Sequence, residues 1–228
     1  MKRKVLIVGI IFLTCTFLVN NCFAQGNKDK AVFEDRLYKF ITCPVAADFS
    51  NSSQCVMLAD KLRSFSNEYP DSIYADDAFY LSVILVPSGK NPTDLEQLIK
   101  KYPNGKLEDS TVKFIEDRTP NDSLRGLPEL YMTYNLTLIF NRGFWSVMEN
   151  NHSETIKYFS EFIVKVDGKN SRIVGQLKFA YMSLLRSYGK LNRKNDVEKI
   201  KNKAILLFPE DKEKINKFCL NLYKSKNK

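Results

Sequence analysis

Pairs of an aromatic residue and a proline end amphipathic helical patterns at three places in this chain. Tyr69-Pro70 and Tyr102-Pro103 are 33 residues apart, and Phe208-Pro209 follows a third such pattern. Each pair predicts a helix end, because proline lacks a backbone N–H and restricts the residue before it. Recurrence at about 34 residues is typical of stacked helix pairs, since one pair cannot bury its own apolar stripe. We therefore expect a stack of helical hairpins.

The rest of the chain carries helical periodicity with few interruptions. Its 228 residues include only 9 Gly and 8 Pro, and no segment sustains a strand-like alternation of apolar and polar residues. The 44% hydrophobic content excludes a wholly disordered chain. We predict an all-α protein of about ten helices, over residues 28–42, 55–65, 75–85, 92–102, 107–115, 128–148, 155–166, 173–188, 196–208 and 212–223.

The first 24 residues have the three-part layout of a secretory signal peptide. Three basic residues precede an apolar run at residues 5–19, and small side chains stand at positions −3 and −1 if cleavage falls between Ala24 and Gln25. The apolar run has 15 residues, fewer than the roughly 18 that a membrane-spanning helix needs. We expect residues 1–24 to direct export and residues 25–228 to form one helical-repeat domain, with a sub-boundary near 119–127.

Two alternatives stay open at the N-terminus. In the first alternative, the apolar run is an uncleaved membrane anchor, but the run is short for a helix that spans a membrane. In the second, Cys22 is acylated after cleavage, but bacterial lipoprotein signals place a small residue before the cysteine and Asn21 stands there. After Gln25, no second apolar run is long enough to span a membrane.

Three cysteines follow the predicted signal. Cys43 and Cys55 flank a predicted loop, and a disulfide between them is plausible in an oxidising compartment. Two buried thiols are the equally weighted alternative. Cys219 lies within a helical pattern, so we expect it to be a buried structural thiol.

Residues around the third aromatic–proline pair resemble the tetratricopeptide repeat. With Pro209 as the terminal proline of a unit, aromatic, aliphatic and small residues fall near the repeat's usual positions: Tyr181, Leu184, Leu185, Tyr188, Val197 and Ala204. An earlier unit then places Gly143 at the close approach between its two helices, with Phe159 and Phe162 in the second helix. The match covers most of residues 52–211 in degenerate form. The resemblance implies a right-handed α-solenoid of tetratricopeptide-like helix hairpins.

The segment from Tyr69 to Leu81 narrows this resemblance. Its Tyr-Pro-Asp-Ser-x-Tyr-Ala-Asp-Asp-Ala pattern, followed by an aromatic-rich helix, is similar to exported tetratricopeptide proteins of the bacterial cell envelope. These include outer-membrane assembly lipoproteins and periplasmic coordinators that bind the Tol system. The resemblance implies a non-enzymatic scaffold that binds other envelope proteins in the periplasm or at the outer membrane.

The same resemblance indicates where a partner would bind. In this repeat class the first helix of each pair lines a concave groove. Partner contacts are therefore expected at Asp76, Phe79, Met182 and Arg186.

Residues with catalytic or metal-binding chemistry are sparse. His152 is the only histidine, which excludes a two-histidine metal site, and its polar surroundings are typical of a helix start on the surface. Asp76-Asp77 and Glu108-Asp109 each fall in an early helical turn, where acids are stabilised by the helix N-terminus. No glycine-rich phosphate loop is present after the signal. We expect no catalytic residue, no metal and no cofactor.

The net charge of +9 allows several partners. Nucleic acid is disfavoured by the predicted export, whereas a solvated basic surface, an acidic protein or peripheral association with a membrane stays open.

The closely spaced aromatics at 131, 134, 140, 144 and 145 are expected to pack in the core. Two alternatives to the scaffold stay open: an enzyme or small-ligand carrier with its site between repeats, and a structural subunit of a larger complex.

Overall fold

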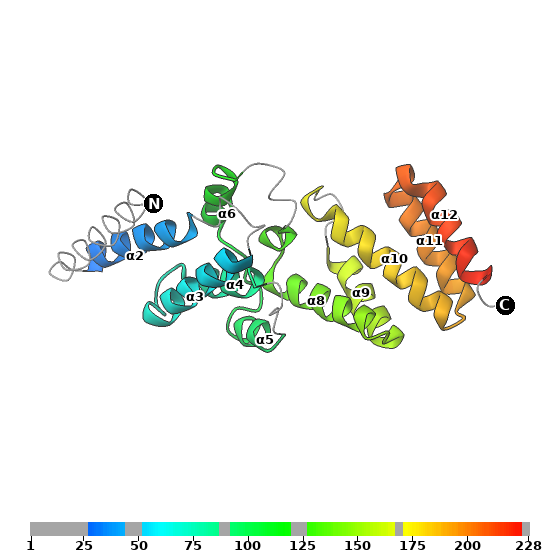
Figure 1. The fold of residues 1–228 in the computed structure, drawn as a ribbon, viewed down its shortest axis with the longest axis horizontal. Helices are drawn as coiled ribbons and strands as arrows, with labels where there is room; N and C mark the ends of the chain where they lie inside the picture. Colours follow the sequence, from blue (N-terminus) through cyan, green and yellow to red (C-terminus); the bar gives the residue numbers. More distant parts are fainter. Residues whose placement is uncertain (1–26, 44–51, 87–91, 120–126, 167–170, 225–228) are drawn as a thin grey trace, which may run out of the picture.

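A computed structural model describes residues 27–43, 52–86, 92–119, 127–166 and 171–224 (Figure 1). This part of the chain is all-α, as predicted, and its only β feature is an isolated antiparallel bridge between Lys106 and Thr133. It contains ten α-helices: α2 (Asn27–Thr42), α3 (Ser52–Glu68), α4 (Ala75–Ile84), α5 (Pro92–Lys101), α6 (Asp109–Glu116), α8 (Tyr134–Met148), α9 (His152–Lys165), α10 (Val174–Lys190), α11 (Lys194–Leu207) and α12 (Lys212–Lys224).

Apart from α6, helices that follow one another in sequence also lie side by side. Contacts connect α2 to α3, α3 to α4, α4 to α5, α5 to α8, and each later helix to the next, up to α12. The molecule is consequently elongated, with α2 and α12 at opposite ends (Figure 1). The helix ends at Glu68, Lys101 and Leu207 fall directly before the three aromatic–proline pairs, as the sequence predicts.

Two apolar clusters form the core. The first cluster contains side chains from the helices α2 through α6 and from the beginning of α8. Its largest fully buried side chains include Tyr38, Tyr80 and Tyr134. The second cluster contains side chains from the rest of α8 and from the helices α9 through α12, and it surrounds Phe159 and Phe162. Because α8 contributes to both clusters, it connects the two halves of the core. The predicted sub-boundary at 119–127 falls mostly outside the described residues.

The prediction of one helix over residues 128–148 is wrong. A short 3-10 helix (Pro128–Tyr131) comes first, Met132 is extended, and α8 begins only at Tyr134. The backbone N–H of Leu136 donates to the side-chain oxygen of Thr133 at 3.2 Å, which makes Thr133 the N-cap of α8. The N–H of Tyr134 donates to the carbonyl of Gly105 at 2.8 Å, so the break also ties this segment to the turn after α5.

The structure describes the three cysteines after the predicted signal but not the signal itself. The proposed signal, with Cys22, Ala24 and Gln25, lies outside the described residues. Cys43 is exposed and Cys55 is buried, and neither forms a disulfide, so the candidate bond between them is not formed in this structure. Cys219 is a buried free thiol, as predicted.

Gly143 permits the close packing of α8 on α9. A Cβ atom added there would lie 2.7 Å from the ring of Phe159, whereas one added at Gly175 in α10 would meet nothing within 4 Å. The close approach predicted at Gly143 is therefore confirmed, and it depends on the absence of a side chain.

Replacing these two glycines by alanine should change stability in opposite directions. Gly143→Ala should lower the free energy of unfolding by about 1–3 kcal/mol, because the buried Phe159 ring must move. Gly175→Ala should raise it by up to about 1 kcal/mol, since alanine favours the helix and no atom obstructs its methyl group. Urea denaturation followed by circular dichroism measures both changes. Equal effects at the two positions would contradict the packing described for α8 and α9.

Candidate functional site

An open groove lies between α3, α4 and α5. Its volume is about 300 Å³. The turn after α3, in which the N–H of Ser72 donates to the carbonyl of Tyr69 at 3.0 Å, directs α4 back along α3, and α5 closes the other side. The residues that line the groove are Ser66, Asn67, Pro70, Ala75, Asp76, Phe79, Gln97, Leu98, Lys101 and Tyr102.

Two of the four predicted contact residues, Asp76 and Phe79, line this groove. The guanidinium of Arg63 lies 5.3 Å from the centre of the Phe79 ring and forms an ion pair with Asp94 at 2.7 Å. Because these contacts join α3, α4 and α5, they hold the Phe79 ring at a fixed place in the groove wall. The contribution of α5 is not apparent from the sequence, in which Tyr102 marks only a helix end.

Asp76 and Asp77 are adjacent in α4 but lie in different environments. Asp76 lines the groove, and its carboxylate accepts a hydrogen bond from the Tyr134 hydroxyl at 3.1 Å. Asp77 is 0% exposed. Both acids belong to the first turn of α4, as predicted, but the hydrogen bonds of Asp77 are made to other helices.

Asp77 ties α4 to the start of α6. Its carboxylate accepts from the N–H of Glu108 at 3.2 Å and from the hydroxyl of Thr111 at 2.7 Å. Glu108 is the N-cap residue of α6 but makes no capping hydrogen bond with its own side chain. Asp77 therefore supplies the acceptor that the beginning of α6 needs. The Tyr134 hydroxyl donates to the same carboxylate at 3.3 Å, which adds α8 to the junction.

Burial raises the pKa of Asp77 to about 7. The neighbouring charge of Asp76 raises this pKa further, whereas the hydrogen bonds from Thr111, Glu108 and Tyr134 lower it. The carboxyl group thus titrates near neutral pH while closed off from solvent. Any exchange of its proton with a bound molecule would require the junction to open.

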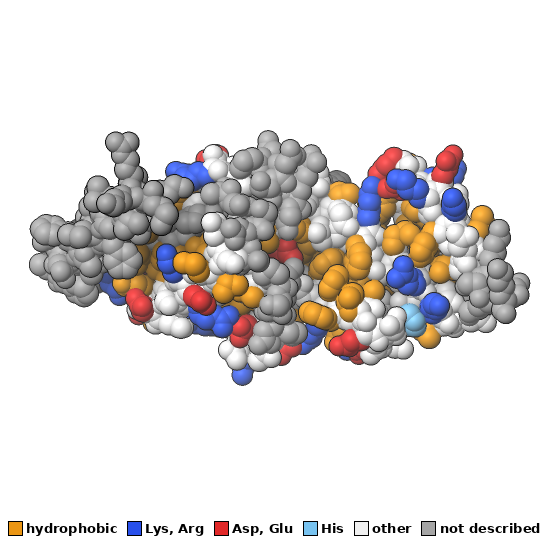
Figure 2. Space-filling model, in the orientation of Figure 1, with side chains coloured by type: hydrophobic (Ala, Val, Ile, Leu, Met, Phe, Trp, Pro, Cys, Tyr) orange, Lys and Arg blue, Asp and Glu red, His pale blue; other side chains and the backbone are white. Residues whose placement is uncertain are grey.

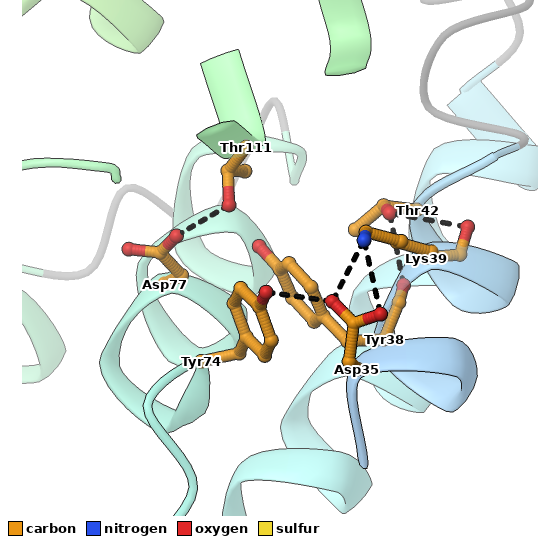
Figure 3. Close-up of polar contacts among 7 residues, drawn as sticks. All are labelled: Asp35, Tyr38, Lys39, Thr42, Tyr74, Asp77 and Thr111. Carbon is orange, nitrogen blue, oxygen red and sulfur yellow. Dashed lines mark hydrogen bonds and ion pairs between the residues drawn. The ribbon is translucent and has the colours of Figure 1, made fainter. Parts of the chain in front are cut away.

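Further tyrosines surround this junction (Figure 3). The ring of Tyr38 stacks on that of Tyr74 with 4.5 Å between the ring centres, and its hydroxyl points towards Asp77 and Thr111. Tyr74 donates to the Asp35 carboxylate at 2.7 Å, and Lys39 forms an ion pair with the same group. Burial and the hydrogen bond to Asp35 raise the pKa of Tyr74 to about 12. The polar contacts hold α2 and α4 together.

Met182 and Arg186, the other two predicted contact residues, lie on α10 and do not line the groove. Met182 is half-buried and Arg186 is exposed. The structure therefore divides the four predicted residues between two surfaces. On the adjacent α8, Tyr134 and Phe140 are buried as predicted, whereas Phe144 and Trp145 are exposed and do not belong to the core.

His152 is the first residue of α9, as its sequence context suggests. Asn151 caps this helix by accepting from the N–H of Glu154 at 3.2 Å. The His152 ring is half-buried, with Nδ1 3.3 Å from the Ser187 hydroxyl. Burial lowers its pKa, as do the nearby cations Lys190 and Arg186. Among the described residues, no three histidine, cysteine or acidic side chains gather in a geometry that would bind a metal ion.

Helices with both the length and the apolar character needed to cross a membrane are absent from the described part of the chain. Comparisons with known protein families, with curated proteins and with solved structures found no match to this chain.

Proposed function

We propose that this chain is an exported, non-enzymatic adaptor of the bacterial cell envelope that binds an extended segment of another protein in the α3–α5 groove. The observation that carries the proposal is the groove itself, an open cavity of about 300 Å³ at the junction of three helices. The helices stack as tetratricopeptide-like hairpins in a right-handed solenoid. The export rests on residues 1–24, which lie outside the described residues.

The repeat architecture is supported by local features of the helix pairs. Successive helices other than α6 pack on one another, and aromatic–proline pairs follow α3, α5 and α11. Gly143 allows α8 and α9 to approach closely, at the position where the resemblance requires a small residue. A stack of this kind exposes a long surface suited to binding extended segments.

The residues of the groove suit a peptide. Asn67 and Gln97 offer amide donors and acceptors that match a peptide backbone, while Phe79 and Tyr102 offer rings for an apolar side chain. Asp76 and Lys101 add one charge of each sign, which would fix the direction of a bound segment. A mixed surface of this type is typical of protein recognition.

Substitutions in the groove should weaken the partner complex without unfolding the protein. Phe79→Ala should reduce affinity at least tenfold, because the complex loses an aromatic anchor in the groove wall. Lys101→Glu should reduce it several-fold by reversing a charge in the groove. The partner is first identified by cross-linking cells that make a tagged chain, and its affinity for each purified variant is then measured by calorimetry.

Two matched variants control this experiment. Lys100→Glu makes the same charge change at an exposed neighbour that does not line the groove. Phe114→Ala removes another half-buried ring that an arginine covers, since the guanidinium of Arg118 lies 3.8 Å from the centre of the Phe114 ring. This ring belongs to α6 and does not line the groove. Both should bind the partner within about twofold of wild type. The proposal fails if the groove variants bind as tightly as these controls.

A small-ligand carrier is the second candidate, and the groove volume favours it specifically. About 300 Å³ is at the lower end of the range for pockets that bind small molecules. If the chain is recovered without a protein partner, and a small molecule raises its melting temperature in wild type but not in Phe79→Ala, this candidate replaces the adaptor.

A further inference from the structure

A second surface, formed by α8 and α10, differs in character from the α3–α5 groove. We call it the aromatic–basic face and define it by Phe144, Met148, Phe179, Met182, Arg186 and Lys190. Phe144, Met148 and Phe179 are 37%, 60% and 37% exposed, which is high for large apolar side chains. Figure 2 shows apolar side chains gathered over the part of the molecule occupied by α8, α9 and α10, with basic side chains beside them.

The exposed rings are held in place from below. The ring centre of Phe179 lies 5.8 Å from that of Phe144, and 6.1 Å and 5.8 Å from those of the buried Phe140 and Phe159. On α10, Met182, Arg186 and Lys190 follow Phe179 at helical spacing, so they continue the same side of the helix. Rigid apolar side chains lose little entropy when a partner covers them, which favours their use as anchors.

The charge on this surface has one sign. Neither α8 nor α10 contains an aspartate or a glutamate, and together they carry Arg142, Lys178, Arg186 and Lys190. Arg142 forms an ion pair with Glu96, and Lys178 pairs with Glu210 and Asp211. No acidic side chain within the described ranges pairs with Arg186 or Lys190. Two cations therefore stand uncompensated beside the exposed rings.

The acids that follow these cations most closely in sequence are paired with other side chains, because Asp196 forms an ion pair with Arg193 and Glu198 forms one with Lys201. At the end of α8, Glu149 is exposed, and the Glu154 carboxylate of α9 lies 4.0 Å from the Lys157 ammonium. Burial lowers the pKa of His152, and Lys190 and Arg186 lower it further, so the charges of both cations act on the imidazole at this end of α10.

We propose that the aromatic–basic face binds an acidic protein segment that carries aromatic or large aliphatic side chains. Acidic groups would pair with Arg186 and Lys190, and apolar side chains would cover Phe144, Phe179 and the two methionines. A nucleic acid fits less well, because two unpaired cations neutralise few phosphates and the surface between them and Phe144 is apolar. The proposal deepens the adaptor function by adding a second binding surface with a stated partner chemistry, and it does not depend on the groove.

Peptide selection on the purified protein tests this proposal. A library of random dodecapeptides displayed on phage is selected on wild type and, separately, on the double variant Arg186→Glu/Lys190→Glu. Peptides enriched on wild type only should combine acidic residues with aromatic or large aliphatic ones. Their affinities are then measured by the fluorescence of Trp145, the only tryptophan in the chain, whose ring lies 6.1 Å from that of Phe144.

A matched double variant controls for total charge. Lys199→Glu/Lys203→Glu reverses two exposed lysines with the same four-residue spacing on α11. The selected peptide should lose at least tenfold in affinity for Arg186→Glu/Lys190→Glu and less than twofold for this control. Phe79→Ala should leave its affinity unchanged, which separates this face from the α3–α5 groove.

Four results would overturn the proposal. The first two are a selection that enriches no peptide, and a selection that enriches peptides without acidic residues. The third is an equal loss of peptide affinity in the two double variants. The fourth is that the protein binds no peptide but binds vesicles of phosphatidylglycerol in a way that requires Arg186 and Lys190. The last result would assign the face to an anionic membrane.

Discussion

Replacing Asp77 by asparagine should remove a large part of the dependence of stability on pH between about 4 and 7. In the folded protein the pKa of Asp77 is raised from 3.8 to about 7, mainly by burial. The folded state therefore holds this proton over a pH range in which the unfolded state has lost it. The contribution of Asp77 to stability consequently falls as the pH rises through this range, and the full cost is present above pH 7.

The size of this effect follows from the shift. A rise of about three pKa units corresponds to about 4 kcal/mol. The free energy of unfolding of Asp77→Asn, relative to wild type, should increase by about this amount between pH 4 and pH 8. Asparagine keeps one acceptor for the Glu108 N–H, and its amide can donate to the oxygen of Thr111 or Tyr134.

Urea denaturation across this pH range measures the difference. His152 contributes in the opposite direction, because its lowered pKa makes the folded state more stable as the pH rises towards about 6.5, but this contribution is common to wild type and variant. Asp109→Asn, at an exposed acid of α6 paired with Lys106, is the matched control and should leave the pH profile unchanged. A constant difference between Asp77→Asn and wild type would contradict the environment described for Asp77.

Phe159→Ala should destabilise the protein by about 3–5 kcal/mol. The Phe159 side chain is fully buried, contacts the rings of Phe140 and Phe179, and fills the space left by Gly143. Its removal leaves a cavity in the second cluster that these rigid neighbours fill only in part. Chemical denaturation followed by far-ultraviolet circular dichroism measures the loss.

Val164→Ala is the control for this substitution. Val164 belongs to the same helix but is 82% exposed, so its truncation should change stability by no more than about 0.5 kcal/mol. If Phe159→Ala were as mild as Val164→Ala, α9 would not pack on α8 and α10 as described.

Much of the fold was predictable because its signals are local. Prolines at 70, 103 and 209 mark helix ends, and each predicted helix has a counterpart in the described part of the chain. The error at residues 128–148 also has a local cause, since Thr133 is a residue type that caps helices, but the apolar run around it favoured a continuous helix.

The sites were predictable only in part, because they depend on which helices meet. Asp76 and Phe79 share the α3–α5 groove, but Gln97 and Tyr102 join them only through the packing of α5. Likewise, nothing near Asp77 in sequence indicates that it bonds to Thr111 in α6. Phe144 is exposed although its apolar side chain predicts burial.

Photocross-linking at position 79 tests the adaptor function most directly. A photoreactive phenylalanine analogue is placed at Phe79, in the groove, and separately at Val164, on an exposed part of α9, in cells that naturally produce the protein. A discrete adduct with one envelope protein from position 79, and none from position 164, is the result that the account predicts. The same adducts from both positions, or none from position 79, would contradict it.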